Sequence, residues 1–131
     1  MKTCDTISAK THAQFLNKLL HLNYKSYMRC TYDLHNDCVI WMIRLDGVRT
    51  STGWVNSLTD WNNTIIEKYV GNQYDKLPSH KIYPLEKRAI FAINESNSKI
   101  RSYVFMGLFE LDKKSTNDNR IWRKISDTYY F

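Results

Sequence analysis

The chain has 131 residues, which is the size of a single domain. Its hydrophobic content of 43%, with only 4 Gly and 2 Pro, excludes wholesale disorder and low-complexity linkers and is sufficient for a packed core. Lysine and arginine (19) outnumber aspartate and glutamate (13), and the resulting net charge of +6 favours an acidic partner such as nucleic acid.

Cysteine usage predicts a reducing compartment. Cys4, Cys30 and Cys38 are odd in number and lack the paired spacing of a zinc site or a disulfide framework. The N-terminal residues contain no apolar leader, and no apolar run is long enough to cross a membrane. We therefore expect a cytoplasmic protein without a membrane partner, a metal or a cofactor.

The first half of the chain predicts one helix and one hairpin. Residues 8–22 place Phe15 and Leu19 on one helical face, with Ser8 or Thr11 as N-cap. Residues 26–33 alternate as a strand, and the apolar run at residues 38–45 is typical of a central strand. The turn residues between these two strands favour their pairing as a hairpin.

A second helix is predicted at residues 57–70. In that segment Leu58, Trp61, Ile65 and Tyr69 fall on one helical stripe, and Gly71 is a suitable residue just after a helix end. The two prolines of residues 71–86 indicate a loop.

The last third of the chain predicts three strands, at residues 87–94, 99–111 and 120–126, separated by polar turns. The whole chain, residues 1–131, is predicted to be a single α+β domain. It would consist of a curled, mostly antiparallel sheet or partial barrel with two flanking helices. The apolar patterning places four residues in the core: Ile40, Ile90, Phe105 and Phe109.

Cations and aromatic residues alternate near the C-terminus, as expected of a surface that binds phosphates and stacks bases. The candidate nucleic-acid contacts are Arg101, Tyr103, Arg120, Trp122, Arg123 and Lys124. The alternative is structural: the charges would keep an outer strand soluble, and Trp122 would pack against the core.

The segment 49–56, RTSTGWVN, is a second candidate contact. Arg49, Thr52, Trp54 and Asn56 offer a guanidinium, a hydroxyl, an indole and an amide, which together could orient a ligand or a base against a ring. The alternative is a turn that leads into the predicted helix, with Trp54 packed on that helix.

A metal-dependent nuclease is the enzymatic hypothesis. Asp112 and Lys114 form an acid-x-Lys pair, and Asp75 could supply the second carboxylate for a divalent ion. The pair lies in a predicted turn, which does not suit this chemistry. The sequence contains no Ser/His/Asp, Cys/His, P-loop or Gly-rich dinucleotide arrangement.

Five residues of the long strand, Tyr103, Phe105, Gly107, Phe109 and Leu111, carry a family resemblance. With RAIFAI before them and RIWRKIS after them, they resemble the closing strands of PUA-like domains, over about a third of the chain. This superfamily includes the SRA and EVE modules of modification-dependent restriction systems. The resemblance implies a β-barrel that binds a modified base or RNA without catalysis. The acidic residue that some of these modules place against a flipped base has no counterpart in residues 49–56.

The resulting prediction is a non-catalytic module that binds DNA or RNA in a defence or counter-defence context. Two alternatives remain at this stage. One is a small phage or mobile-element protein that inhibits a host nuclease by protein–protein binding. The other is the minimal metal-dependent nuclease.

Overall fold

A computed structural model describes residues 1–71, 86–95 and 99–131. Nearly all of the predicted loop at 71–86, including Asp75, lies outside these residues. The described elements follow the order β1 (Thr6–Ala9), α1 (His12–Leu20), β2 (Thr31–Asp33), β3 (Cys38–Ile43), β4 (Trp54–Thr59), β5 (Thr64–Tyr69), β6 (Lys87–Glu95), β7 (Arg101–Leu111) and β8 (Asn119–Ser126).

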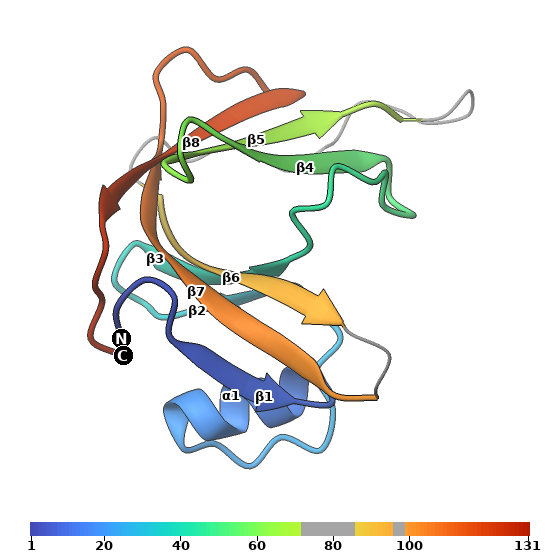
Figure 1. Cartoon of the computed structure of the whole chain (residues 1–131), viewed down its shortest axis with the longest axis vertical. Coiled ribbons are helices and arrows are strands. Elements are labelled where there is room, and N and C mark those ends of the chain that lie inside the picture. The colour runs from blue at the N-terminus through green and yellow to red at the C-terminus, as the bar shows by residue number, and fades with distance from the viewer. Residues whose placement is uncertain (72–85, 96–98) are drawn as a thin grey trace.

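The strands form one open, curled sheet in the order β2-β3-β6-β7-β8-β5-β4, with β1 added beside β7. All pairs are antiparallel except β3 with β6, which run parallel. Figure 1 shows the sheet bending so that the β4–β5 hairpin stands over β3 and β6, with α1 beneath β1. The two termini lie side by side, and Lys2 bridges to Thr128.

The curl of the sheet is centred on β7. The pairing register of β7 shifts against β6 at Ile90/Phe91 and against β8 at Leu108/Phe109, as a β-bulge would require. Gly107, with a φ of 118°, lies between the shifts, and a Cβ there would lie 2.7 Å from the backbone oxygen of Ser126. Glycine therefore allows β8 to cross close to the bent strand.

Two hydrophobic clusters fill the two sides of the sheet. One lies under α1 and includes Phe15 and Phe105, while the other lies on the concave side and includes Phe109 and Trp122. Strand β6 contributes to both clusters, since alternate residues point to opposite faces. This explains the uninterrupted apolar run AIFAI at residues 89–93. The four predicted core residues, Ile40, Ile90, Phe105 and Phe109, are all 0% exposed, which confirms that prediction.

The first predicted helix is present but shorter than expected. Helix α1 begins after Thr11, whose side chain accepts a hydrogen bond from the Gln14 backbone N–H, and it ends at His21 in a left-handed conformation. Ser8 is not a cap, because it pairs with Ser102 in the β1–β7 ladder. No helix in the described part of the chain is long and apolar enough to cross a membrane.

The predicted helix at 57–70 is wrong, so the fold has one helix among the described residues instead of two. The segment forms most of the β4–β5 hairpin, with a turn in which Asp60, Trp61 and Asn62 all have positive φ. The two apolar runs match helical spacing by coincidence. The residues between them, Asp60, Asn62 and Asn63, favour a turn, and this is the stronger signal. Trp61, assigned to the buried stripe, is 94% exposed at the hairpin tip.

The other strand predictions agree with the structure apart from their ends. The predicted strand at 26–33 is confined to β2 (Thr31–Asp33), which pairs with β3 in the expected antiparallel hairpin. The three C-terminal strands correspond to β6, β7 and β8.

The hairpin and the core yield a paired stability prediction. Phe109→Ala should lower the free energy of unfolding by about 3–5 kcal/mol, because it leaves a cavity in the concave-side cluster. Trp61→Ala should change it by no more than about 0.5 kcal/mol, since the indole is exposed. Chemical denaturation measures both values. A large loss at Trp61 would restore the helical interpretation of residues 57–70.

Candidate functional site

A cavity of about 1100 Å³ lies on the concave side of the sheet. Residues of β2 and β3 and of the loop before them line one wall, and residues of β4 and β5 line the other. This volume is slightly above the range typical of ligand-binding clefts, about 300–1,000 Å³. The curl of the sheet, which brings its two end hairpins opposite each other, creates this space (Figure 1).

Three side chains of the β4–β5 hairpin line the cavity: Trp54, Asn56 and Glu67. Trp54 and Asn56 are two residues apart on β4, so they project from the same face. Glu67 is the direct cross-strand partner of Asn56. The hairpin register therefore places an indole, an amide and a carboxylate next to one another on one wall.

The amide of Asn56 has unused hydrogen-bonding capacity. Asn56 is only 6% exposed, and its Oδ1 has no hydrogen-bond partner among the residues that the structure describes. A buried carbonyl without a partner costs about 1–3 kcal/mol. Because Asn56 also lines the cavity, we take this residue as a candidate ligand contact.

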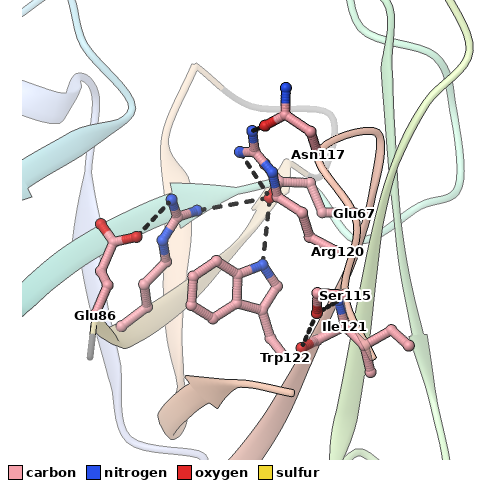
Figure 2. Close-up of polar contacts among 8 residues, drawn as sticks. Glu67, Glu86, Ser115, Asn117, Arg120, Ile121 and Trp122 are labelled. Carbon is pink, nitrogen blue, oxygen red and sulfur yellow. Dashed lines mark hydrogen bonds and ion pairs between the residues drawn. The ribbon is translucent and has the colours of Figure 1, made fainter. Parts of the chain in front are cut away.

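Glu67 is held in place by three contacts to one of its oxygens. The Trp122 indole N–H donates to Oε1 at 3.2 Å, and Nη1 atoms of Arg120 and Arg88 lie 3.5 Å and 3.9 Å from the same atom. Figure 2 shows the contacts from Trp122 and Arg120 meeting at Glu67. These contacts fix the Glu67 carboxylate on the cavity wall.

Arg88 lies beside the Glu67 carboxylate and packs against two buried indole rings. Its guanidinium lies between two rings, 4.4 Å from the centroid of Trp41 and 4.2 Å from that of Trp122. It also pairs with Glu86 at 3.5 Å. Arg88 is 6% exposed, and its Nε has no hydrogen-bond partner within residues 1–71, 86–95 and 99–131. Cation–π contacts and two carboxylates compensate the buried charge.

Arg120 and Trp122 lie behind the cavity wall, so the prediction that they form an exposed basic-aromatic surface is wrong. Arg120 is 1% exposed and Trp122 is 0% exposed. The guanidinium of Arg120 covers the Trp54 ring at 4.7 Å, and burial lowers its pKa while Glu67 opposes that shift. Strand β8 lies between β7 and β5, and its inward Trp122 packs against Trp41 of β3 and Arg88 of β6 across the curled sheet.

The remaining C-terminal candidates form structural contacts. Arg123 pairs with Asp112, and Lys124 pairs with Asp127 at 3.2 Å. The Arg101 Nε lies 2.6 Å from Glu95, and buried Tyr103 places its hydroxyl 2.8 Å from His12 Nδ1. Of these residues only His12 lines the cavity.

The 49–56 segment behaves differently from the C-terminal strand. Thr52 lines the cavity together with Trp54 and Asn56, and Arg49 is exposed in the same loop. Thr50 closes the turn, since its hydroxyl accepts from the Trp54 backbone N–H at 3.1 Å. Three of the four candidates predicted in this segment therefore meet at one wall.

Three tyrosines form the edge of the opposite wall. Tyr24, Tyr27 and Tyr32 pack with ring centroids 5.5–6.2 Å apart. The side chain of Asn17 fixes this loop through two hydrogen bonds to the Tyr24 backbone, at 2.8 Å and 2.9 Å. The loop is thus an ordered part of the cavity and not a free segment.

The acid-x-Lys pair gains no support as a metal site. The carboxylate of Asp112 accepts from the Lys114 backbone N–H at 2.8 Å and from Arg123, and these bonds lower its pKa. Asp112 therefore stabilises a turn. Within the described ranges no group of three or more His, Cys, Asp or Glu residues is placed to hold a metal ion.

Two central residues were not among the predicted contacts. Glu67 was assigned to a helix, which concealed its pairing with Asn56, and Arg88 lies in an apolar strand with no motif. The sequence feature that could have identified Glu67 as a site residue was the hairpin turn at Asp60–Asn63. Pairing the flanking runs across that turn brings an acidic residue beside Asn56.

The chain belongs to the SRA (SET and RING associated) domain family, whose model matches residues 1–131. The family resemblance therefore extends over the whole chain and not only its last third. A solved structure, the 5-hydroxymethylcytosine-specific restriction enzyme AbaSI, matches with 30% sequence identity and a TM-score of 0.66. The match covers 93% of this chain and 39% of AbaSI, so the chain spans well under half of that enzyme. A comparison with curated proteins gives no match.

The buried ion pairs of Arg88 predict that its removal destabilises the protein far more than removal of Arg123. Arg88→Ala should lower the free energy of unfolding by about 3–5 kcal/mol, because it removes the ion-pair partner of Glu86 and one of the two arginines at Glu67 and empties the space between Trp41 and Trp122. Arg123→Ala should cost no more than about 1 kcal/mol, since its side chain is 51% exposed in its pair with Asp112. Denaturant titrations compare the two variants. Equal losses would mean that the Arg88 cluster is effectively solvated.

His12 predicts a pH dependence of stability. Burial, followed by Arg101 and Arg44, lowers the pKa of His12 below its ordinary value of 6.5. The unfolded chain therefore binds this proton more tightly, and the stability due to neutral His12 is lost as the pH falls below about 6.5. Unfolding titrations between pH 7 and pH 5 should show a decline that is smaller in His12→Gln. An unchanged slope in the variant would contradict this assignment.

Proposed function

We propose that this chain is a DNA-binding module that recognises a modified cytosine turned out of the duplex into the cavity. The observation that carries the proposal is the wall formed by Trp54, Asn56 and Glu67, with a buried Asn56 oxygen that has no partner in the described structure. A base inside a duplex cannot reach such a wall, so the nucleotide must rotate out of the stack.

The hydrogen-bonding character of the wall favours cytosine over thymine. Asn56 Oδ1 and Glu67 Oε2 are two acceptors on paired residues. The exocyclic amino group of cytosine is a donor, whereas thymine presents a carbonyl oxygen at the same position. A cytosine therefore satisfies both acceptors, while a thymine would place a third acceptor against them. Each matched contact is worth about 1–3 kcal/mol of discrimination.

Trp54 supplies the stacking surface. Its ring is half-buried, contacts Tyr69 at a centroid distance of 5.2 Å and is backed by the Arg120 guanidinium. A ring that is fixed from behind loses little freedom when a base stacks on its other face. Arg120 thus contributes to recognition through Trp54 and not through a phosphate.

Cations around the cavity suit the DNA backbone. Arg29 lines the cavity, and Arg49 projects from the neighbouring loop. Arg44 also lines the cavity, where it pairs with Glu95 at 2.7 Å. A flipped base brings its own phosphates to the edge of its pocket, and these are positions where a guanidinium can contact them. The net charge of +6 supports this backbone contact.

The comparisons support the modified-base class of ligand. The family is the SRA domain, and AbaSI is described as specific for 5-hydroxymethylcytosine. The proposal concerns recognition only, because the matched region is 39% of that enzyme. 5-Hydroxymethylcytosine is therefore the first ligand to test.

Binding to modified and unmodified duplexes of the same sequence, at two salt concentrations, tests the proposal. Affinity for both should fall with salt, because each neutralised phosphate releases a counterion. The preference for the duplex that contains 5-hydroxymethylcytosine should persist at both concentrations, since base contacts release no counterions. Equal affinities for the two duplexes would contradict the proposal.

Two matched pairs of variants distinguish the contribution of the cavity wall to DNA binding from that of the rest of the surface. Trp54→Ala should weaken binding to the modified duplex by about 1–3 kcal/mol at either salt concentration. Trp61→Ala, which removes an exposed indole away from the cavity, should not weaken it. Glu67→Gln should weaken binding to the modified duplex, because it removes an acceptor for the cytosine amino group, whereas Glu110→Gln makes the same charge change on an exposed site and should not. Indistinguishable effects within either pair would exclude the wall as the base contact.

A further inference from the structure

The cavity contains a thiol that the recognition of a base does not explain. Cys30 lines it and is exposed, and its backbone oxygen accepts a hydrogen bond from the Met42 N–H at 2.8 Å. Cys4 is also exposed but does not line the cavity, and Cys38 is buried at 3% exposure. The three cysteines thus occupy three different environments within one chain.

Cys30 and the polar wall that we assign to the base line the same cavity. The Cys30 thiol interacts electrostatically with both Arg88 and Glu67. Burial raises the pKa of the thiol, and Arg88 partly opposes that shift. Cys30 is therefore an exposed residue of the cavity whose thiol is partly desolvated.

Two further atoms mark this cavity as a ligand site independently of the cysteine. Asn56 and Arg88 are each 6% exposed and line the cavity. Asn56 Oδ1 and Arg88 Nε have no hydrogen-bond partner among the described residues. A molecule that satisfies these groups and an adduct on Cys30 would share one cavity.

We propose that Cys30 is a modification site inside the cavity, where a mixed disulfide with a small thiol and a bound base exclude each other. The co-reactant is a low-molecular-weight disulfide. This inference rests on the proposed function, because it takes the base as the ligand that competes with the adduct.

The reaction is a thiol–disulfide exchange. The Cys30 sulfur attacks one sulfur of the small disulfide, a new S–S bond forms and the original S–S bond breaks. The other half of the reagent leaves as a thiolate and takes up the proton that Cys30 has lost. Since the thiolate is the nucleophile, the raised pKa predicts slow modification near neutral pH and a rate that keeps increasing into the alkaline range.

Glutathione disulfide and mass spectrometry test the site itself. In the native protein Cys30 should form the adduct, and Cys38 should not until the protein is unfolded. A saturating duplex that contains 5-hydroxymethylcytosine should slow the reaction at Cys30 and leave the reaction at Cys4 unchanged. Cys4 is thus an internal control in the same molecule. A native Cys30 as inert as Cys38, or equal protection of Cys4 and Cys30, would overturn the proposal.

The affinity for the modified duplex, measured before and after treatment with glutathione disulfide, tests whether the adduct excludes the base. The wild type and Cys4→Ser should each lose at least about tenfold in affinity for the modified duplex, and a reductant should restore it. Cys30→Ser should show the same affinity after treatment as before. Loss in all three proteins, or in none, would overturn the proposal. If the untreated wild type showed no preference for the modified duplex, the proposed function would fail instead, which distinguishes the two outcomes.

Discussion

The buried carboxylate of Glu67 is the group on which the rest of the site depends. It is 7% exposed, and transferring a carboxylate into such surroundings costs several kcal/mol unless it is paired and hydrogen-bonded. Arg120, Arg88 and the Trp122 indole all supply this compensation through one oxygen. They come from β8 and β6, so a single charge connects three strands of the curled sheet.

This arrangement also determines what remains available to a ligand. The protein's contacts hold the Glu67 carboxylate on the cavity wall, and the hairpin register places Asn56 directly opposite it. Arg120 and Arg88 carry their charge behind or beneath aromatic rings and so hold those rings in place. The cations that we first assigned to phosphate binding thus include one, Arg120, that supports a stacking surface from inside the protein.

Sequence patterns predicted the strands better than the contacts between them. The runs that became β6, β7 and β8 were correct because continuous apolar residues or strict alternation, bounded by polar turns, have few other solutions. The helix predicted at residues 57–70 was wrong because Leu58, Ile65 and Tyr69 fit a helical stripe as well as a hairpin. Only pairing across the Asp60–Asn63 turn distinguishes the two, and that pairing is also what brings Glu67 to Asn56. Trp54 and Asn56 were predicted as site residues from their side-chain chemistry alone. The burial of Arg120 and Trp122 depends on where β8 lies in the sheet, and a local sequence pattern does not give that position.

A crystal structure of the chain bound to a duplex with one 5-hydroxymethylcytosine tests the account most directly. The account predicts that the modified base lies in the cavity, stacked on Trp54, with its amino group within hydrogen-bonding distance of Asn56 Oδ1 and Glu67 Oε2. A modified base that remains stacked in the duplex, with the protein bound through another surface and the cavity empty, would contradict it.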